Sequence, residues 1–277
     1  MRIKFLGTGA SQGIPSPFCK CRVCENARRV KGKEIRSRSS VMIDGEMMID
    51  YSPDRFFQSA INGEDVTAIK YFLITHSHYD HFAVKDLVEN CDKKLEQDNQ
   101  SQRKYLICGN EKVCSIVGAE CRKAENGESC PTMLMQSKKS TIIGDYKVTA
   151  LKSEHTLEEQ SLVYIIEREG KCYLHCCDSG ELIEETIDYL ISASVKLQAV
   201  TFDSTFGLRE EKFYGHMNLS QVVSMREKLL KENIITDKTR IYLTHVSHSG
   251  RCTHEELSVC AEKYGMEVAY DGLEIEI

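Results

Sequence analysis

Apolar and polar residues alternate in many short stretches of this chain, and a period of two is typical of β-strands that bury one face. Strands are predicted on this basis at residues 1–6, 39–43, 47–50, 65–75, 103–108, 146–151, 162–167, 171–177, 197–202 and 240–243. Asp44-Gly45 separates two of these stretches, and the pair predicts a tight hairpin because it accepts positive φ angles. Asp271-Gly272 predicts a second turn, between two short strands.

Apolar residues at spacings of three and four predict helices between the strands. The predicted helices cover residues 83–96, 111–123 and 181–191, and two more begin near Asn218 and Thr253. Asn218 with Gln221, and Thr253 with Glu256, form capping boxes, in which side chains satisfy free amide groups of the first helical turn. Residues 125–139 have no clear period and are predicted to be irregular.

Hairpins and helices occur in both halves of the chain, which favours two β-sheets packed face to face with helices outside. This is an α/β fold, a four-layer αββα sandwich, and we expect one domain over residues 1–277. The hydrophobic fraction of 41% supplies enough residues for such a core.

The charge balance and the apolar runs restrict the partners. A formal net charge of −6 argues against a dedicated binder of long nucleic acid, which needs many Lys and Arg contacts to phosphates. No stretch approaches the ~20 apolar residues that span a bilayer. Residues 1–7 are interrupted too soon for a signal peptide. We therefore expect a cytoplasmic protein with a small substrate and no membrane partner.

The densest chemical signal is the run His76-Ser77-His78-Tyr79-Asp80-His81, which directly follows the apolar residues 71–75. The side chains of His76 and His78 point to the same side of an extended chain, and those of Asp80 and His81 can turn to a neighbouring position. Imidazole and carboxylate ligands suit zinc, manganese or iron. Four candidate ligands are more than one tetrahedral ion with a bound water uses, so the motif predicts two metal ions.

Three further candidate ligands stand just after predicted strands, namely His155, Asp178 and His245. A lone histidine is more often a surface residue or a hydrogen-bonded core residue than a ligand. Here, however, five of nine histidines and two aspartates lie at strand ends, where sheet-based enzymes usually build their sites. The joint pattern therefore favours a metal centre.

On these residues the chain resembles the metallo-β-lactamase superfamily, whose signature His-x-His-x-Asp-His is matched by residues 76–81. The resemblance covers essentially the whole chain, and all seven ligands of the family pattern are present. It implies one ion on His76, His78 and His155, and a second on Asp80, His81 and His245, with Asp178 as the bridge. Two such ions lower the pKa of bound water towards ~7 and can clamp a phosphoryl group.

A second metal site is predicted near the N-terminus. The chain has 13 cysteines, and without a secretory signal reduced thiols are favoured, some of them as metal ligands. Cys19, Cys21 and Cys24 supply three thiolates, and His248 is the natural fourth ligand of a structural zinc ion, because it lies three residues after His245. The alternative is a set of free thiols.

Several segments resemble one branch of the superfamily, the cyclic-phosphate phosphodiesterases of carbon–phosphorus bond breakdown, which open a ribosyl 1,2-cyclic phosphate. These segments are residues 7–13, the cysteine cluster, residues 243–248 and residues 271–275. The resemblance implies that His216 assists catalysis, because a histidine can give a departing alkoxide a proton or a charge partner. The alternative for His216 is a loop residue near a helix start. Residues 86–140 do not align with that branch and leave the substrate open.

The function predicted from these signals is hydrolysis of a small, cyclic phosphodiester by attack of metal-bound hydroxide, with His216 and Asp80 as the catalytic side chains. An RNA 3′-processing endonuclease and a lactone or thioester hydrolase use the same metal core and remain alternatives. A metal-binding cofactor carrier is the non-enzymatic alternative, and its mark would be a missing ligand.

Other polar groups have less specific predictions. The basic run over residues 28–38 is typical of a solvated face, although it could also draw phosphorylated substrates. Residues 203–205 follow a strand and are expected to line the pocket. Cys176 and Cys177 are expected in the core, and His254 on the surface.

Overall fold

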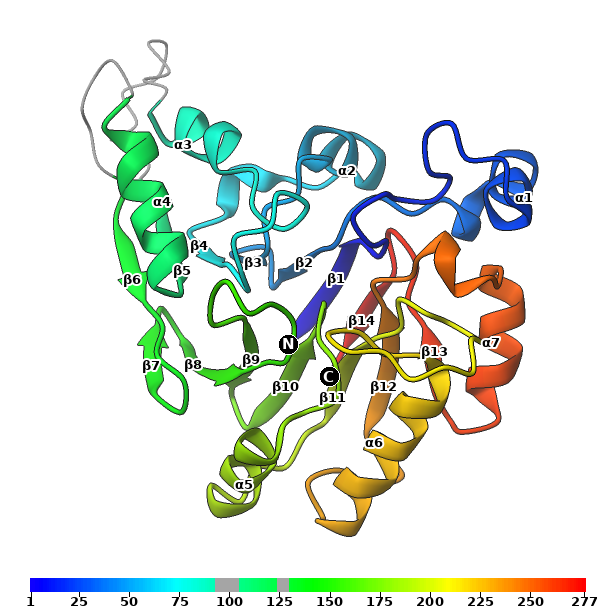
Figure 1. The fold of residues 1–277 in the computed structure, drawn as a ribbon. Coiled ribbons are helices and arrows are strands. Elements are labelled where there is room, and N and C mark those ends of the chain that lie inside the picture. Colours follow the sequence, from blue (N-terminus) through cyan, green and yellow to red (C-terminus); the bar gives the residue numbers. More distant parts are fainter. Residues whose placement is uncertain (93–104, 124–129) are drawn as a thin grey trace.

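The computed structural model describes residues 1–92, 105–123 and 130–277, and these residues contain two seven-stranded sheets (Figure 1). The first sheet has the strand order β14-β1-β2-β3-β4-β5-β6. Its members are β1 (Arg2–Gly7), β2 (Ser40–Ile43), β3 (Met47–Ile49), β4 (Tyr71–Leu73), β5 (Leu106–Gly109), β6 (Thr132–Leu134) and β14 (Glu274–Glu276).

The second sheet has the strand order β13-β12-β11-β10-β9-β8-β7. Its members are β7 (Ser140–Ile143), β8 (Tyr146–Lys152), β9 (Leu162–Arg168), β10 (Lys171–Cys176), β11 (Ala199–Asp203), β12 (Arg240–Thr244) and β13 (Glu267–Val268). Each sheet is antiparallel in one half and parallel in the other, the parallel halves being β3 to β6 and β10 to β13. The carboxyl ends of neighbouring parallel strands therefore meet at one edge of each sheet.

Alternation along the strands builds the layer between the sheets. In β9, Tyr164 and Ile166 pack into a cluster with Ile3 and Phe5 of β1, whereas Ile165 packs on the opposite face. This is the period of two that the sequence predicts for strands in a sandwich. All of these side chains are at most 1% exposed.

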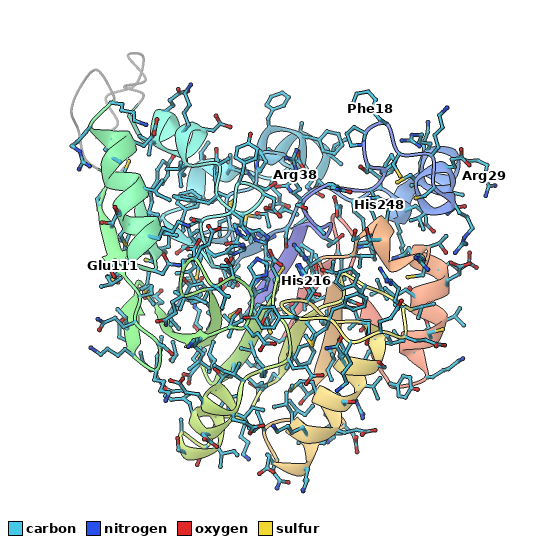
Figure 2. The ribbon with its side chains drawn as sticks, in the orientation of Figure 1. Phe18, Arg29, Arg38, Glu111, His216 and His248 are labelled. Carbon is cyan, nitrogen blue, oxygen red and sulfur yellow. The ribbon has the colours of Figure 1, made fainter. Side chains whose placement is uncertain are left out.

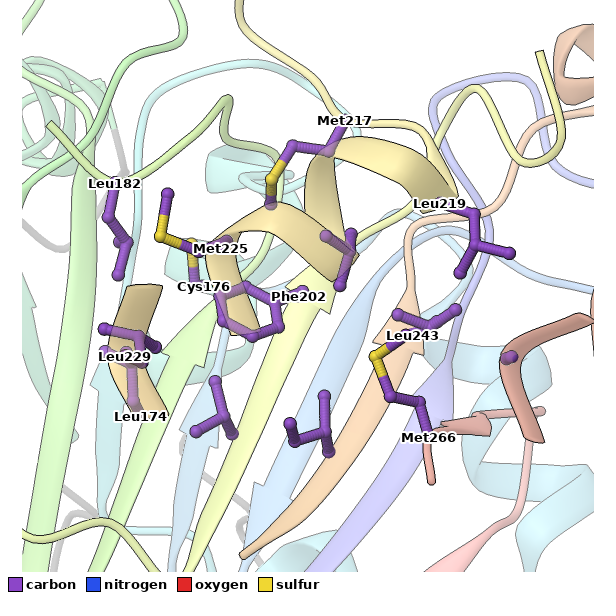
Figure 3. Packing of buried hydrophobic residues seen from close by; sticks show 14 of the residues in the cluster. Leu174, Cys176, Leu182, Phe202, Met217, Leu219, Met225, Leu229, Leu243 and Met266 are labelled. Atoms are coloured by element: carbon purple, nitrogen blue, oxygen red, sulfur yellow. The ribbon is translucent and has the colours of Figure 1, made fainter. Parts of the chain in front are cut away.

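Helices cover the outer faces of both sheets (Figure 1). They are α1 (Arg22–Val30), α2 (Arg55–Asn62), α3 (Val84–Asp92), α4 (Glu111–Cys121), α5 (Glu184–Ser192), α6 (Leu219–Lys231) and α7 (His254–Glu262), with short 3-10 turns at Gly32–Glu34, Val66–Ala68 and His248–Gly250. On the second sheet, Met225 and Leu229 of α6 pack against Leu174 and Phe202 (Figure 3). Leu87 of α3 and Val117 of α4 belong to the cluster on the first sheet. The predicted αββα sandwich is confirmed.

Both capping boxes and the Asp44-Gly45 turn form as predicted. The strand predicted at 65–75 is shorter, because the Asp65 side chain accepts the Thr67 amide and starts a 3-10 turn, so that β4 begins at Tyr71. Residues 125–139 were predicted irregular, but Thr132–Leu134 pairs with β5 as β6. Residues 93–96 of the predicted helix 83–96, 103–104 of a predicted strand and 125–129 lie outside the described residues. Among the described helices, none is long and apolar enough to cross a membrane.

Candidate metal centre

The seven predicted ligands come from strand ends in both sheets. The His-rich motif follows β4 of the first sheet, and His155, Asp178 and His245 follow β8, β10 and β12 of the second. Because open α/β sheets place ligands beyond the carboxyl ends of parallel strands, this edge is the expected location of a site. The structure brings all seven side chains together there.

The first group of candidate ligands consists of His76, His78, His155 and Asp178, whose ligand atoms all lie within 4.8 Å of one another. His155 Nε2 is 3.1 Å from His78 Nδ1, and His76 Nε2 is 3.3 Å from Asp178 Oδ2. Burial and the charge of His76 lower the pKa of His155 to about 4, although Asp178 opposes this. Its imidazole is therefore neutral at pH 7, the form that binds metal ions.

The second group consists of Asp80, His81, His245 and, again, Asp178, with ligand atoms within 4.8 Å of one another. His81 Nε2 lies 3.1 Å from Asp178 Oδ2 and 3.3 Å from His245 Nε2. Two imidazoles and two carboxylates that converge on so small a volume repel or share protons unless a cation lies among them. The donor set fits zinc, manganese or iron.

Asp178 is common to both groups and is 3% exposed. Its φ angle of 49° lies in the left-handed region, where a residue other than glycine is uncommon and is often found at functional sites. Imidazole nitrogens lie close to this carboxylate, yet among the described residues no hydrogen bond of good geometry reaches the buried atoms Asp178 Oδ1 and His76 Nε2. Burial would raise the pKa of Asp178, but His245, His216 and other imidazoles hold it well below its usual range. Bound divalent ions would satisfy both atoms, so these residues fit the predicted metals.

Two buried aspartates orient the imidazoles of the second group, and the sequence did not single out either role. Asp50 Oδ2 lies 2.6 Å from His81 Nδ1, and Asp203 Oδ2 lies 3.1 Å from His245 Nδ1. A carboxylate on Nδ1 fixes the tautomer that presents Nε2 to a metal ion. Asp203, expected to line the pocket, is instead 0% exposed beneath the histidines. The position of each aspartate at the end of a buried strand was the available signal.

His216 lies beside the two groups, near the centre of the view in Figure 2. Its Nδ1 is 3.1 Å from Asp178 Oδ1 and 3.2 Å from Asp203 Oδ2. Phe206 contacts the ring edge to face, at a centroid distance of 5.7 Å, and Phe213 stacks on Phe206. Burial opposes protonation, but the two carboxylates raise the pKa of His216 to about 10. The side chain is 25% exposed, so one edge of the ring is open to a substrate.

The predicted structural zinc ligands also come together, beside α1 and away from His216 (Figure 2). Cys19 Sγ and Cys21 Sγ each lie 3.6 Å from His248 Nδ1, and Cys24 Sγ completes a group within 4.8 Å. Hydrogen bonds from Cys24 and His248 lower the pKa of Cys21 to about 6 against the effect of burial, so a thiolate is favoured. Three thiolates and one imidazole fit a closed tetrahedral zinc site.

The basic run over residues 28–38 is not a continuous solvated face. Arg36 is 3% exposed and donates to Thr8, to the carbonyl of Ala269 and to His254 Nδ1. Arg38 forms a two-pronged ion pair with Asp54, at 2.9 and 2.7 Å. The contact with Arg36 also contradicts the predicted surface position of His254, which is half-buried. Cys176 and Cys177 are buried in the core as predicted.

Parts of the chain are similar in sequence to known proteins. A family model described as the beta-lactamase superfamily domain matches residues 46–246. An octanoyltransferase of Porphyromonas gingivalis (strain ATCC BAA-308 / W83) is 38% identical over 85 residues, which are 29% of this chain and 16% of that protein. The chain thus spans only a small part of that relative.

Solved structures resemble the chain over its whole length. A zinc-bound PqqB from Methylobacterium extorquens has a TM-score of 0.74 at 18% identity, covering 100% of both chains. A diphosphatase of the PhnP family has a TM-score of 0.75 at 22% identity, covering 100% of this chain and 98% of that one. The short form of human tRNase Z has a TM-score of 0.65 at 19% identity, covering 100% and 99%. At these identities the likeness shows the fold. The family match over residues 46–246 establishes that the chain belongs to the beta-lactamase superfamily, and this membership indicates a metal-dependent hydrolase.

Proposed function

We propose that this protein is a dinuclear, metal-dependent phosphodiesterase that hydrolyses a small, cyclic phosphodiester. The observation that carries the proposal is the position of Asp178, whose carboxylate is shared by both groups of candidate ligands and also contacts His216. A shared carboxylate is the natural bridge between two ions. Two ions held by these residues would lower the pKa of a bound water and would polarise a phosphoryl oxygen during an in-line displacement.

The chain's own residues then have two tasks, to hold the ligands in place and to manage the proton of the leaving group. His216 is suited to the second task, because both carboxylate contacts use Nδ1 and leave Nε2 as the atom that can reach a substrate. Asp203 orients this ring and also the ring of His245. We infer that His216 donates a proton from Nε2 to the departing alkoxide, a task that typically contributes ~10²–10⁴-fold to a rate.

The surroundings of the centre support a small substrate over a long RNA. Arg36 and Arg38, two of the cations in the basic run, are engaged in internal contacts. Exposed apolar side chains instead lie close in sequence to the ligands, with Tyr79 65%, Leu157 92% and Tyr214 60% exposed. These rings and this aliphatic chain suit the apolar face of a small organic group.

A second candidate is hydrolysis of an acyl thioester. It is favoured by the similarity of 85 residues to an octanoyltransferase and by the exposed apolar side chains close in sequence to the ligands. The same two ions would polarise a thioester carbonyl as readily as a phosphoryl oxygen.

A panel of substrates separates these candidates. Metal-loaded protein would be assayed with bis(p-nitrophenyl) phosphate, a 2′,3′-cyclic nucleotide, an octanoyl thioester, a lactone and a precursor tRNA. We expect turnover of the diesters and its loss in Asp80→Ala, with Asp86→Ala as a control on α3. Turnover of the thioester alone would favour the second candidate, and turnover of the tRNA alone would contradict the small-substrate proposal.

A further inference from the structure

Glu159 lies in the loop between β8 and β9, four residues after His155, and its side chain is 1% exposed. The side chain of the preceding Glu158, in contrast, is 76% exposed. A buried carboxylate costs free energy unless hydrogen bonds replace its hydration. The loop must therefore gain partners for Glu159 that it does not need for Glu158.

Those partners come from two other segments. The Ser77 amide donates to both carboxylate oxygens of Glu159, at 3.1 Å each, and the Ser77 hydroxyl donates to Oε1 at 2.5 Å. The side-chain amide of Asn110 donates to Oε2 at 2.6 Å. Lys112 Nζ lies 3.6 Å from Oε1. One carboxylate thus joins the His-rich motif, the start of α4 and the loop that carries His155.

Asn110 gives this junction a fixed support. Its side-chain oxygen accepts the Val113 amide and caps α4, while its amide nitrogen also donates to the carbonyl of Gln160 at 2.9 Å. The amino end of α4 carries partial positive charge, which favours an anion there. Burial would raise the pKa of Glu159, but hydrogen bonds from Ser77 and Asn110 outweigh it and lower the pKa. The carboxylate is therefore charged at neutral pH.

We propose that Glu159 is a positioning residue for the ion of the His76, His78 and His155 group. Ser77 stands between two of these histidines, so fixing its amide and hydroxyl sets the backbone from which both imidazoles project. The third histidine lies on the loop of Glu159 itself. Glu159 also places a negative charge close to this group, where it favours a bound cation. Loss of such outer contacts typically weakens metal binding ~10–100-fold.

The proposal rests on the metal centre of the proposed function but not on its substrate, so metal binding is the readout. Zinc would be titrated into chelator-stripped protein in competition with a chromophoric chelator. In Glu159→Gln, which keeps the shape and removes the charge, we expect one active-site ion to bind ~10–100-fold more weakly while the others are unchanged. Glu158→Gln is the matched control and should bind like the wild type.

Single-site backgrounds identify the ion. In His155→Ala, which removes a ligand of the affected group, Glu159→Gln should cause no further weakening; in His245→Ala it should cause its full effect. If Glu159→Gln does not fold, Ser77→Ala removes one hydroxyl contact and should weaken the same ion alone. Unchanged binding, or equal weakening of every ion, would overturn the proposal. A wild type that binds no ion at this centre would instead contradict the proposed function.

Discussion

Asp50 offers a substitution that changes one side-chain atom beneath the metal centre. Its Oδ1 accepts the Thr75 amide at 2.8 Å, and its Oδ2 lies 2.6 Å from His81 Nδ1. Asp50→Asn preserves the volume, and asparagine tolerates the φ angle of 61° at this position. The new amide can accept a hydrogen bond from only one of these two neighbours. If its oxygen stays on Thr75, its NH₂ group faces His81 Nδ1, which must then become the acceptor.

The expected losses of metal affinity and of folding stability follow from that exchange of hydrogen-bond partners. With Nδ1 as acceptor, the proton of a neutral His81 ring moves to Nε2, the atom that faces Asp178 at 3.1 Å. Metal affinity should fall ~10–100-fold, because an outer contact that sets the tautomer is lost. This equals about 1.4–2.7 kcal/mol. If the amide turns the other way, the Thr75 amide is left unsatisfied and folding loses about 1–3 kcal/mol.

Zinc affinity by chelator competition and urea unfolding of the metal-free protein would measure the two effects. Asp44→Asn is the matched control, since Asp44 also has a positive φ and a hydrogen-bonded carboxylate, but it contacts Tyr146 and Arg168 at the other end of β3. We expect Asp44→Asn to lose stability and to keep its metal affinity. Asp50→Asn with wild-type metal affinity and wild-type stability would refute the tautomer argument.

Three further changes have defined outcomes. His216→Asn should lower kcat by ~10²–10⁴-fold with unchanged zinc content, since it removes the proton donor but no predicted ligand; loss of zinc in this variant would instead make His216 a ligand. Cys21→Ser should release the zinc ion of the Cys19, Cys21, Cys24 and His248 site and lower the unfolding temperature, measured by zinc analysis and calorimetry, whereas unchanged zinc content would favour free thiols. Burial and the cations Arg36 and Lys33 lower the pKa of His254 to about 3. Between pH ~6.5 and 3 the unfolded chain therefore binds a proton that the folded chain does not bind, and the free energy of unfolding falls as the pH falls. His254→Gln should reduce this dependence in urea unfolding at pH 7 and pH 5, and an unchanged dependence would show that His254 does not cause it.

The sequence predicted the candidate ligands because their signal is local. Four of them stand within residues 76–81, and His155, Asp178 and His245 each follow an apolar strand. Strand ends in a parallel sheet converge, so positions distant in sequence could be expected at one edge. The structure places them together as that reasoning requires.

The supporting carboxylates could not be assigned in the same way. Asp50 and Asp203 each end an apolar strand, but nothing in the sequence pairs either carboxylate with a particular histidine. Glu159 lacks even this signal and does not differ in sequence from a surface acid such as Glu158. Their roles depend on which imidazole or amide the fold brings opposite them. This is a tertiary property, and the pattern of apolar and polar residues does not predict it.

The basic run shows the opposite error, in which a local pattern is given too much weight. Charge runs are usually solvated, yet Arg36 is buried because Thr8, Ala269 and His254, from opposite ends of the chain, converge on its guanidinium. Strand β6 was missed for a different reason. Residues 132–134 have little pattern of their own, and they form a strand because β5 offers them a parallel edge.

Two ions bridged by Asp178 can be observed most directly by anomalous X-ray diffraction from crystals grown with Zn²⁺ or Mn²⁺, recorded on both sides of the metal absorption edge. We predict two anomalous peaks ~3.5–4 Å apart, one beside His76, His78 and His155 and the other beside Asp80, His81 and His245. A single peak, or peaks that do not share Asp178, in crystals with saturating metal would contradict the dinuclear centre.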